Sequence, residues 1–215
     1  MSPARLRDGF RAALPLALAP ILFAASFGLL AQEAGMGRAA AVVMSATTFA
    51  GSAQFAAISI LDSGGGAASA IVAAVLLNAR YVPLSLSVAS IFPGSRLRRF
   101  VEAQLIVDES WALAGRSGRF EYAILIGVGL TFYPLWVLCT AAGTVVGDLL
   151  DPVAIGLDAA FPALFLALLV PYLRSRGAAA AAALAAAITF VLVPLTPPGV
   201  PIVAASAACL LGLRR

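Results

Sequence analysis

The sequence predicts an all-α polytopic integral membrane protein, and three observations support this fold class. The chain of 215 residues is 62% hydrophobic and only 11% charged, whereas charged residues make up about 25% of an ordinary soluble domain. Its mean hydropathy is +1.01. Apolar blocks near the roughly 20 residues that a transmembrane helix needs recur along the chain and leave little sequence between them. We therefore expect a single transmembrane domain over residues 1–215.

Seven apolar blocks predict about six to seven membrane segments. They cover residues 12–31, 39–61, 66–92, 121–147, 160–173, 177–193 and 199–213. The first block follows three arginines, as in a signal peptide, but its length and the blocks behind it favour a retained span. In the fourth block, Gly143 and Gly147 have the G-x-x-x-G spacing that predicts a close helix contact, either internal or with a partner.

The arginines predict which loops face the cytoplasm, because short cytoplasmic loops carry an excess of basic residues. They form four clusters, namely Arg5, Arg7 and Arg11; Arg96, Arg98, Arg99, Arg116 and Arg119; Arg174 and Arg176; and Arg214 and Arg215. From Glu121 onward the arginine clusters lie where complete crossings by each apolar block would place the cytoplasmic loops. In the first half they do not: if the N-terminus is cytoplasmic and the first three blocks all cross, the second arginine cluster lies outside. Either the N-terminus is outside or the block 66–92 does not cross.

The block 66–92 is long for one crossing and carries polar residues in its middle. Its 27 residues span about 40 Å as a helix, against a hydrocarbon core of about 30 Å. An arginine such as Arg80 costs about 2.5 to 3.5 kcal/mol at the bilayer centre and normally faces protein or a water-filled cavity. We expect this block to be broken or re-entrant, with its turn near Asn78 to Pro83 and both ends at the cytoplasmic side. The alternative is one tilted span with the N-terminus outside.

Three polar motifs interrupt the apolar character of the chain. They are Ala50-Gly51-Ser52-Ala53-Gln54-Phe55, Asn78-Ala79-Arg80-Tyr81 and Asp108-Glu109-Ser110-Trp111. In this order and spacing, and together with Phe161-Pro162-Ala163-Leu164-Phe165, they resemble the AzlC-type branched-chain amino acid permease family. The resemblance implies a multi-pass transporter of the cytoplasmic membrane that exports branched-chain amino acids, with methionine as a further substrate, and a small AzlD-like membrane partner. Tyr81 departs from the family pattern, in which histidine is frequent, and this removes one candidate proton-titrating group.

Arg80 and Asn78 are the first candidates for substrate contact. A guanidinium stays charged when buried and matches the geometry of a carboxylate, so we expect Arg80 to hold the carboxylate of an amino-acid substrate. The alternative is a structural ion pair with Asp108 or Glu109. Asn78 is expected either to accept a hydrogen bond from the substrate ammonium or to cap a break in the helix.

Gln54, Ser52 and Phe55 complete the expected substrate site. Gln54 offers a donor and an acceptor, and the small residues before it leave room for a ligand; its alternative role is an interhelical hydrogen bond. Phe55 is expected to line an apolar pocket or to be ordinary packing. Asp108 and Glu109 are the candidates for coupling or gating, because burial and a nearby arginine tune the pKa of an acid. The alternative is that both are solvated loop acids.

Secondary transport of apolar amino acids by alternating access is the function that these residues favour. The sequence contains no P-loop motif, so we expect coupling to an ion gradient. An enzyme is not expected, because the chain has no histidine and no paired catalytic groups. Neither nucleic-acid binding nor a metal, cofactor or disulfide is expected, and Cys139 and Cys209 are interpreted as packing residues. The alternative function is a structural or channel-forming membrane subunit without its own substrate site.

Overall fold

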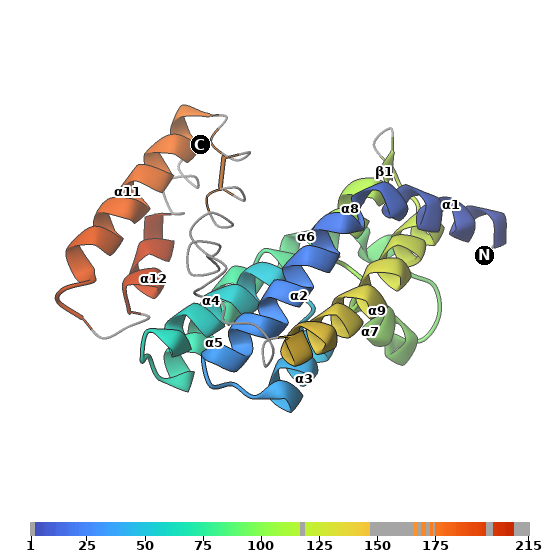
Figure 1. The fold of residues 1–215 in the computed structure, drawn as a ribbon. Coiled ribbons are helices and arrows are strands. Elements are labelled where there is room, and N and C mark those ends of the chain that lie inside the picture. The colour runs from blue at the N-terminus through green and yellow to red at the C-terminus, as the bar shows by residue number, and fades with distance from the viewer. Residues whose placement is uncertain are drawn as a thin grey trace.

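The protein is almost entirely helical in the part of the chain that the structure describes, as the sequence predicts. This computed structural model describes residues 3–116, 119–146, 166, 169, 170, 173, 175–196 and 200–208. The helical elements are α1 (Pro3–Ala13), η1 (Leu14–Leu16), α2 (Leu18–Glu33), α3 (Arg38–Thr48), α4 (Gly51–Asp62), α5 (Ala67–Asn78), α6 (Tyr81–Val88), η2 (Ala89–Ile91), α7 (Arg96–Ala103), α8 (Asp108–Ala114), α9 (Tyr122–Val146), α11 (Arg176–Leu192) and α12 (Val200–Ala205) (Figure 1). Two short strands, β1 (Gly115–Arg116) and β2 (Arg119–Phe120), pair antiparallel between α8 and α9.

Helix α9 is the centre of the packing, and α1, α2 and α3 lie along it (Figure 1). Glycines let the backbones approach closely: a Cβ atom at Gly127 would lie 2.6 Å from the Leu6 carbonyl oxygen, and one at Gly143 would overlap the Ala25 carbonyl oxygen. Gly143 therefore serves an internal contact, whereas Gly147 lies outside the described residues. Because α1 meets the start of α9 and α2 meets its end, the α1–α2 segment and α9 run in the same direction.

Two of the described helices are long and apolar enough to cross a bilayer, and a bent pair can form a third crossing. The two helices are Ala67–Ile91 and Tyr122–Val146, and the pair is Arg5–Leu16 with Leu18–Glu33, bent by 65°. The predicted count of six to seven segments is not confirmed. Block 39–61 divides into two short helices, block 177–193 forms the 17-residue α11, and most of block 160–173 lies outside the described residues.

Block 39–61 is not the single span that its length predicts, because the chain reverses at Phe49 and Ala50. Phe49 has a left-handed φ of 43° and ψ of 48°, and Ala50 is extended. The helices on either side, α3 and α4, have 11 and 12 residues, or about 17 Å each, which is too short to cross a core of about 30 Å. We call α3, α4 and the Phe49–Ala50 turn the first hairpin.

Both ends of the first hairpin return to the C-terminal end of α2. Ala41 in α3 and Ile58 in α4 belong to one apolar cluster with Leu30 of α2. The tip lies instead beside the middle of α9, where the rings of Tyr133 and Trp136 meet Phe49. The first hairpin therefore enters the helical body from the end where α2 finishes and leaves at the same end.

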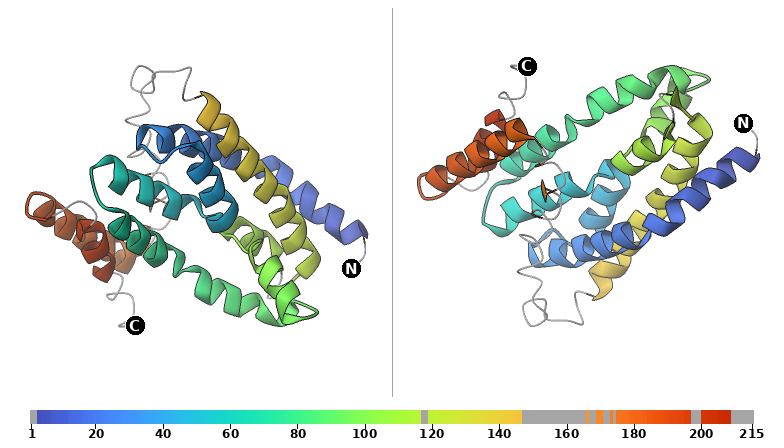
Figure 2. Two further views of the ribbon diagram at one scale, coloured as in Figure 1. Left: turned by 90° about the horizontal axis from the view of Figure 1, so that it is seen from below. Right: turned by 90° about the horizontal axis from the view of Figure 1, so that it is seen from above.

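Block 66–92 forms one helix whose regular hydrogen bonding is interrupted at residues 79–80 without a reversal of the chain. Only Ala79 and Arg80 separate α5 from α6, and both keep right-handed helical angles. Pro83 causes the irregularity, because it has no N–H to donate to the carbonyl oxygen of Ala79. The predicted break is present, but the predicted re-entrant turn is wrong, since Ala67–Ile91 runs on as a 25-residue apolar helix (Figure 2).

A second hairpin follows, made of α7, a tip at residues 104–107 and α8. Its base lies beside the first residue of α9, where Arg98 donates a hydrogen bond of 3.1 Å to the Tyr122 hydroxyl. Its tip reaches further along α9, because a Cβ atom at Gly129 would lie 2.7 Å from the Leu105 carbonyl oxygen. The two hairpins thus approach the middle of α9 from opposite ends.

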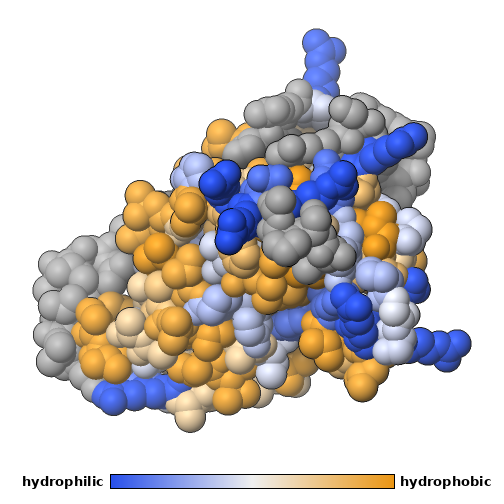
Figure 3. Space-filling model, turned by 90° about the vertical axis from the view of Figure 1, so that its right-hand side faces the viewer, coloured by the Kyte–Doolittle hydropathy of each residue, from blue (hydrophilic) through white to orange (hydrophobic). Residues whose placement is uncertain are grey.

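Large apolar side chains remain on the surface of the described residues. Along α5 and α6 they include Ile71, Val75, Val82 and Leu86. Apolar side chains also dominate the coloured surface of the face in Figure 3. Such extensive apolar exposure is typical of surfaces that lipid or a membrane partner covers.

Candidate functional site

The tip of the first hairpin is held in its left-handed conformation by aromatic packing. A bulky residue at positive φ is strained and persists only where its surroundings impose it. The Phe49 ring packs edge-to-face on Tyr133 at 5.2 Å and on Trp136 at 6.3 Å between centroids. Gly51 leaves space for this arrangement, because a Cβ atom there would lie 2.8 Å from the Trp136 ring.

A buried polar network fastens this tip to α9. The Gln54 amide nitrogen donates to Ser45 Oγ at 2.8 Å, and Ser45 in turn shares a 2.8 Å hydrogen bond with Thr140 Oγ1. Trp136 Nε1 donates to Gln54 Oε1 at 2.9 Å, and the Ala50 backbone N–H approaches the same oxygen at 3.3 Å. Gln54, Ser45 and Thr140 are all 0% exposed. The network joins both arms of the first hairpin to one face of α9.

Gln54, a predicted substrate-contact residue, makes its hydrogen bonds within the protein itself. Its oxygen and its nitrogen both have partners, which is the interhelical role that the sequence left open. Substrate contact by Gln54 stays a prediction. Sequence reasoning missed Ser45, Trp136 and Thr140, although Trp136 and Thr140 lie four residues apart in an apolar block and so share a helix face.

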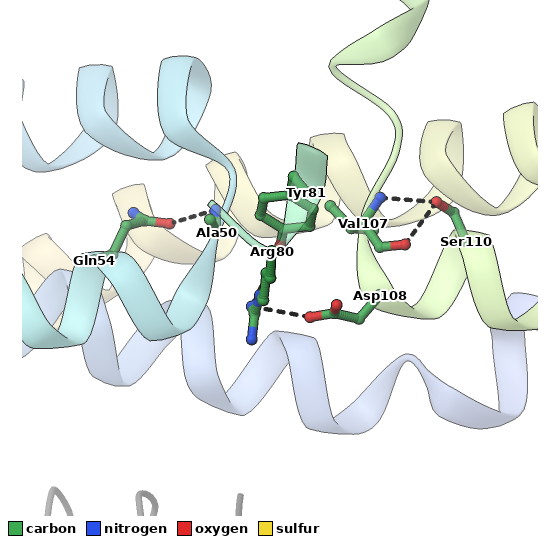
Figure 4. Close-up of polar contacts among 7 residues, drawn as sticks. All are labelled: Ala50, Gln54, Arg80, Tyr81, Val107, Asp108 and Ser110. Atoms are coloured by element: carbon green, nitrogen blue, oxygen red, sulfur yellow. Dashed lines mark hydrogen bonds and ion pairs between the residues drawn. The ribbon is translucent and has the colours of Figure 1, made fainter. Parts of the chain in front are cut away.

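Arg80 and Asp108 form an ion pair, although they belong to different motifs of the sequence. Arg80 Nη2 lies 2.9 Å from Asp108 Oδ2, and the two side chains are 39% and 40% exposed. The pair joins the α5–α6 break to the first residue of α8, at the tip of the second hairpin (Figure 4). Tyr81 supports the guanidinium, whose carbon lies 5.2 Å from the ring centroid. The structural pairing that the sequence offered as an alternative is thus present.

Ser52 and Asn78, two further predicted site residues, carry buried oxygens without a hydrogen-bond partner. These are Ser52 Oγ, in the first turn of α4, and Asn78 Oδ1, at the end of α5. A buried polar atom without a partner costs about 1 to 3 kcal/mol, so native proteins seldom keep one without a reason. Both atoms adjoin a helix break, Ser52 the Phe49–Ala50 turn and Asn78 the junction at Arg80.

Phe55 and Glu109 are the remaining predicted site residues. The Phe55 ring is 2% exposed and packs edge-to-face on Phe27 of α2 at 5.9 Å, so in this structure it contributes to helix packing. Glu109 keeps an exposed outer surface. Burial of its carboxyl by the surrounding protein raises the pKa of Glu109, and the charge of Asp108 adds to the shift, while a backbone hydrogen bond and Arg80 oppose it.

The arrangement of Arg80 and Asp108 can bind charged groups of a ligand. The partly exposed side chains of Arg80 and Asp108 face one another. Because an exposed ion pair contributes little to stability, a charged group of a ligand can replace either partner. In the part of the chain that the structure describes, no group of three or more His, Cys, Asp or Glu side chains is placed to hold a metal ion.

Comparison with known proteins gives a family and membrane relatives. A family model described as AzlC protein matches residues 15–150. A protein from Archaeoglobus fulgidus named "Uncharacterized membrane protein" is 36% identical over 203 residues, which is 92% of this chain and 90% of the relative. A Helicobacter pylori protein with the same name is 26% identical over 166 residues, or 75% of this chain and 73% of the relative. No solved structure matches.

Proposed function

The chain belongs to the AzlC family of membrane proteins, and from that premise we propose that it is a secondary transporter that exports branched-chain amino acids, and methionine, across the cytoplasmic membrane. An ion gradient drives the export, and a small AzlD-like membrane protein is the partner. The exposed apolar side chains of α5 and α6 offer a surface for such a partner or for lipid.

The Arg80–Asp108 pair is the observation that carries this proposal. An α-amino acid at neutral pH has one carboxylate and one ammonium group, which match the two side chains. A substrate that enters between them gives Arg80 its carboxylate and Asp108 its ammonium, so every charge keeps a partner throughout. The unpaired oxygens of Ser52 and Asn78, each beside a helix break, offer further hydrogen-bond acceptors for the substrate ammonium.

The two hairpins give the proposed path across the membrane. The α1–α2 segment leaves the cytoplasm, the first hairpin dips in from outside and returns, and α5–α6 crosses back. The second hairpin then dips in from the cytoplasm, and α9 crosses outward. This path puts Arg5 to Arg11 and Arg96 to Arg119 on the cytoplasmic side, which resolves the conflict in the arginine count, because block 39–61 rather than block 66–92 fails to cross.

Counterflow of labelled leucine in proteoliposomes, with and without the small partner, tests the proposed function. We expect leucine, isoleucine and valine to drive counterflow. The 2-oxo acid and the amine with the same carbon skeleton as leucine should each fail, because each carries only one of the two charges. Counterflow driven equally well by the amine would contradict the role of Arg80, and the absence of counterflow with every amino acid would contradict transport.

Sidedness is tested separately with a reporter after Ser2 and another in the 63–66 turn. The proposed path requires the first reporter inside and the second outside. A reporter inside at the 63–66 turn would mean that block 39–61 crosses the membrane.

A further inference from the structure

The tips of the two hairpins are joined by one side chain, Gln104. This residue follows α7 and lies at the start of the second tip. Its amide nitrogen donates to the carbonyl oxygen of Thr47 at 2.9 Å and to that of Ala46 at 3.2 Å. Both acceptors belong to the last turn of α3, so the contact links the first hairpin directly to the second.

The carbonyl groups at the end of α3 need such donors. The last four carbonyls of a helix have no partner within the helix, and the reversal at Phe49 prevents the chain from continuing as a helix that would supply them. The Tyr133 hydroxyl donates to Ala46 O at 2.9 Å, and the Gln104 amide nitrogen donates to Ala46 O and to Thr47 O. A glutamine amide carries two N–H groups, so a single side chain serves two carbonyls.

Two features distinguish this contact from the buried network around Gln54. It is only partly buried, whereas Gln54 is 0% exposed. Gln104 also begins the second tip and Asp108 follows it directly, so the contact with α3 and the ion pair hold the two ends of the same short segment.

We propose that Gln104 is a positioning residue that latches the two hairpin tips together, and that the tips part during each transport cycle. This inference rests on the proposed function of the Arg80–Asp108 site. In the latched state the tips close the path beside the ion pair. Insertion of a substrate between Arg80 and Asp108 moves the second tip, breaks the bonds to Ala46 and Thr47, and opens the path on one side.

A reporter cysteine at the first tip tests the latch without any substrate. Ala50 is 1% exposed, so Ala50→Cys, in a background with Cys139→Ala and Cys209→Ala, should react slowly with an impermeant maleimide. Addition of Gln104→Leu should raise the labelling rate from one side of the membrane by about 3- to 10-fold, the range expected for loss of one or two modest hydrogen bonds. Gln104→Glu keeps the size but loses the donors and should behave like Gln104→Leu. Gln32→Leu is the matched control and should not change the rate.

A reversible tether gives the second test. Ala46→Cys and Gln104→Cys, joined by a short cleavable thiol crosslinker in the same background, should reduce leucine counterflow to that of empty vesicles, and reduction of the linker should restore it. Full counterflow in the tethered protein overturns the latch, as does unchanged Ala50→Cys labelling in both Gln104 variants. If labelling changes while the untethered protein transports no amino acid, the latch stands and the proposed function fails. If the Gln104 variants do not fold, the labelling rate of Ala50→Cys with Gln104 intact decides instead, measured with and without leucine at a concentration that supports counterflow. Faster labelling in leucine supports the parting of the tips, and an unchanged rate overturns it.

Discussion

The buried network around Gln54 and the Arg80–Asp108 pair both join segments that are distant in the sequence, but they differ in exposure. In the first, Gln54, Ser45 and Thr140 are 0% exposed and the Gln54 amide has partners at both ends. In the second, both partners are more than one-third exposed. A buried amide with every partner in place is costly to disturb, whereas an exposed ion pair contributes little to stability and exchanges easily. We therefore expect the first to hold the hairpin in place and the second to bind substrate.

The largest expected effect is on transport by Arg80→Ala. Truncation of a charged group that pairs with a ligand costs about 2 kcal/mol or more, which is about 30-fold in Vmax/KM. Counterflow of labelled leucine measures it. Arg80→Lys keeps the charge without the two-pronged geometry and should fall between the wild type and Arg80→Ala. Equal transport by all three proteins would remove Arg80 from the site.

Gln54→Leu should lower stability rather than binding. It leaves the N–H groups of Trp136 and Ala50 buried without their acceptor, at about 1 to 3 kcal/mol each, and the loss appears in thermal unfolding of the detergent-solubilised protein. The double variant Gln54→Leu with Trp136→Phe removes one of these donors and should recover part of the loss. The comparison between the two regions breaks down if Gln54→Leu unfolds like the wild type and yet binds no leucine.

Gly143→Ala tests the close contact that supports the network on α9. The added Cβ atom would overlap the Ala25 backbone of α2, and overpacking of this kind typically costs about 1 to 3 kcal/mol. Gly66→Ala is the matched control, because no atom lies within 4 Å of its Cβ position and its φ of −76° suits alanine. Equal melting temperatures for both variants would contradict the packing described for α2 and α9.

The smallest expected effect is the pH dependence contributed by Glu109. Its folded-state pKa is raised above the ordinary value of a glutamate carboxyl, so the folded protein holds this proton to a higher pH than the unfolded chain does. Stability from this group is therefore lost as the pH rises above about 4.5 through the folded-state pKa. Glu109→Gln should remove this loss, and melting curves at several pH values measure the difference. An identical pH profile in the variant would show that the carboxyl titrates normally.

The helical membrane character was predictable from the sequence, but the hairpins were not. Pro83 signals a break because proline has a local effect on the backbone. Phe49 carries no such signal: its left-handed conformation is imposed by Tyr133 and Trp136, which lie more than eighty residues away. The assumption that block 39–61 crosses left two alternatives, a re-entrant block 66–92 or an N-terminus outside.

The sequence named both residues of the observed ion pair but few of the contacts made by the other candidates. Arg80 and Asp108 were both named, and their pairing was one of two alternatives, because a charge in an apolar block requires a partner. The partners of Gln54 were not named, since Ser45 and Thr140 are ordinary small residues whose proximity depends on the hairpin. Gln104 was missed for the same reason.

Leucine-dependent thermal stabilisation of the purified Arg80→Ala and Gln54→Leu variants tests the central claim most directly. A ligand that binds only the folded state raises the melting temperature, and the rise grows with the logarithm of the ligand concentration relative to its Kd. We expect leucine to raise the melting temperature of the wild type and of Gln54→Leu, although the latter starts lower, and to leave that of Arg80→Ala unchanged. A leucine shift that persists in Arg80→Ala and disappears in Gln54→Leu would contradict the assignment of binding to the ion pair.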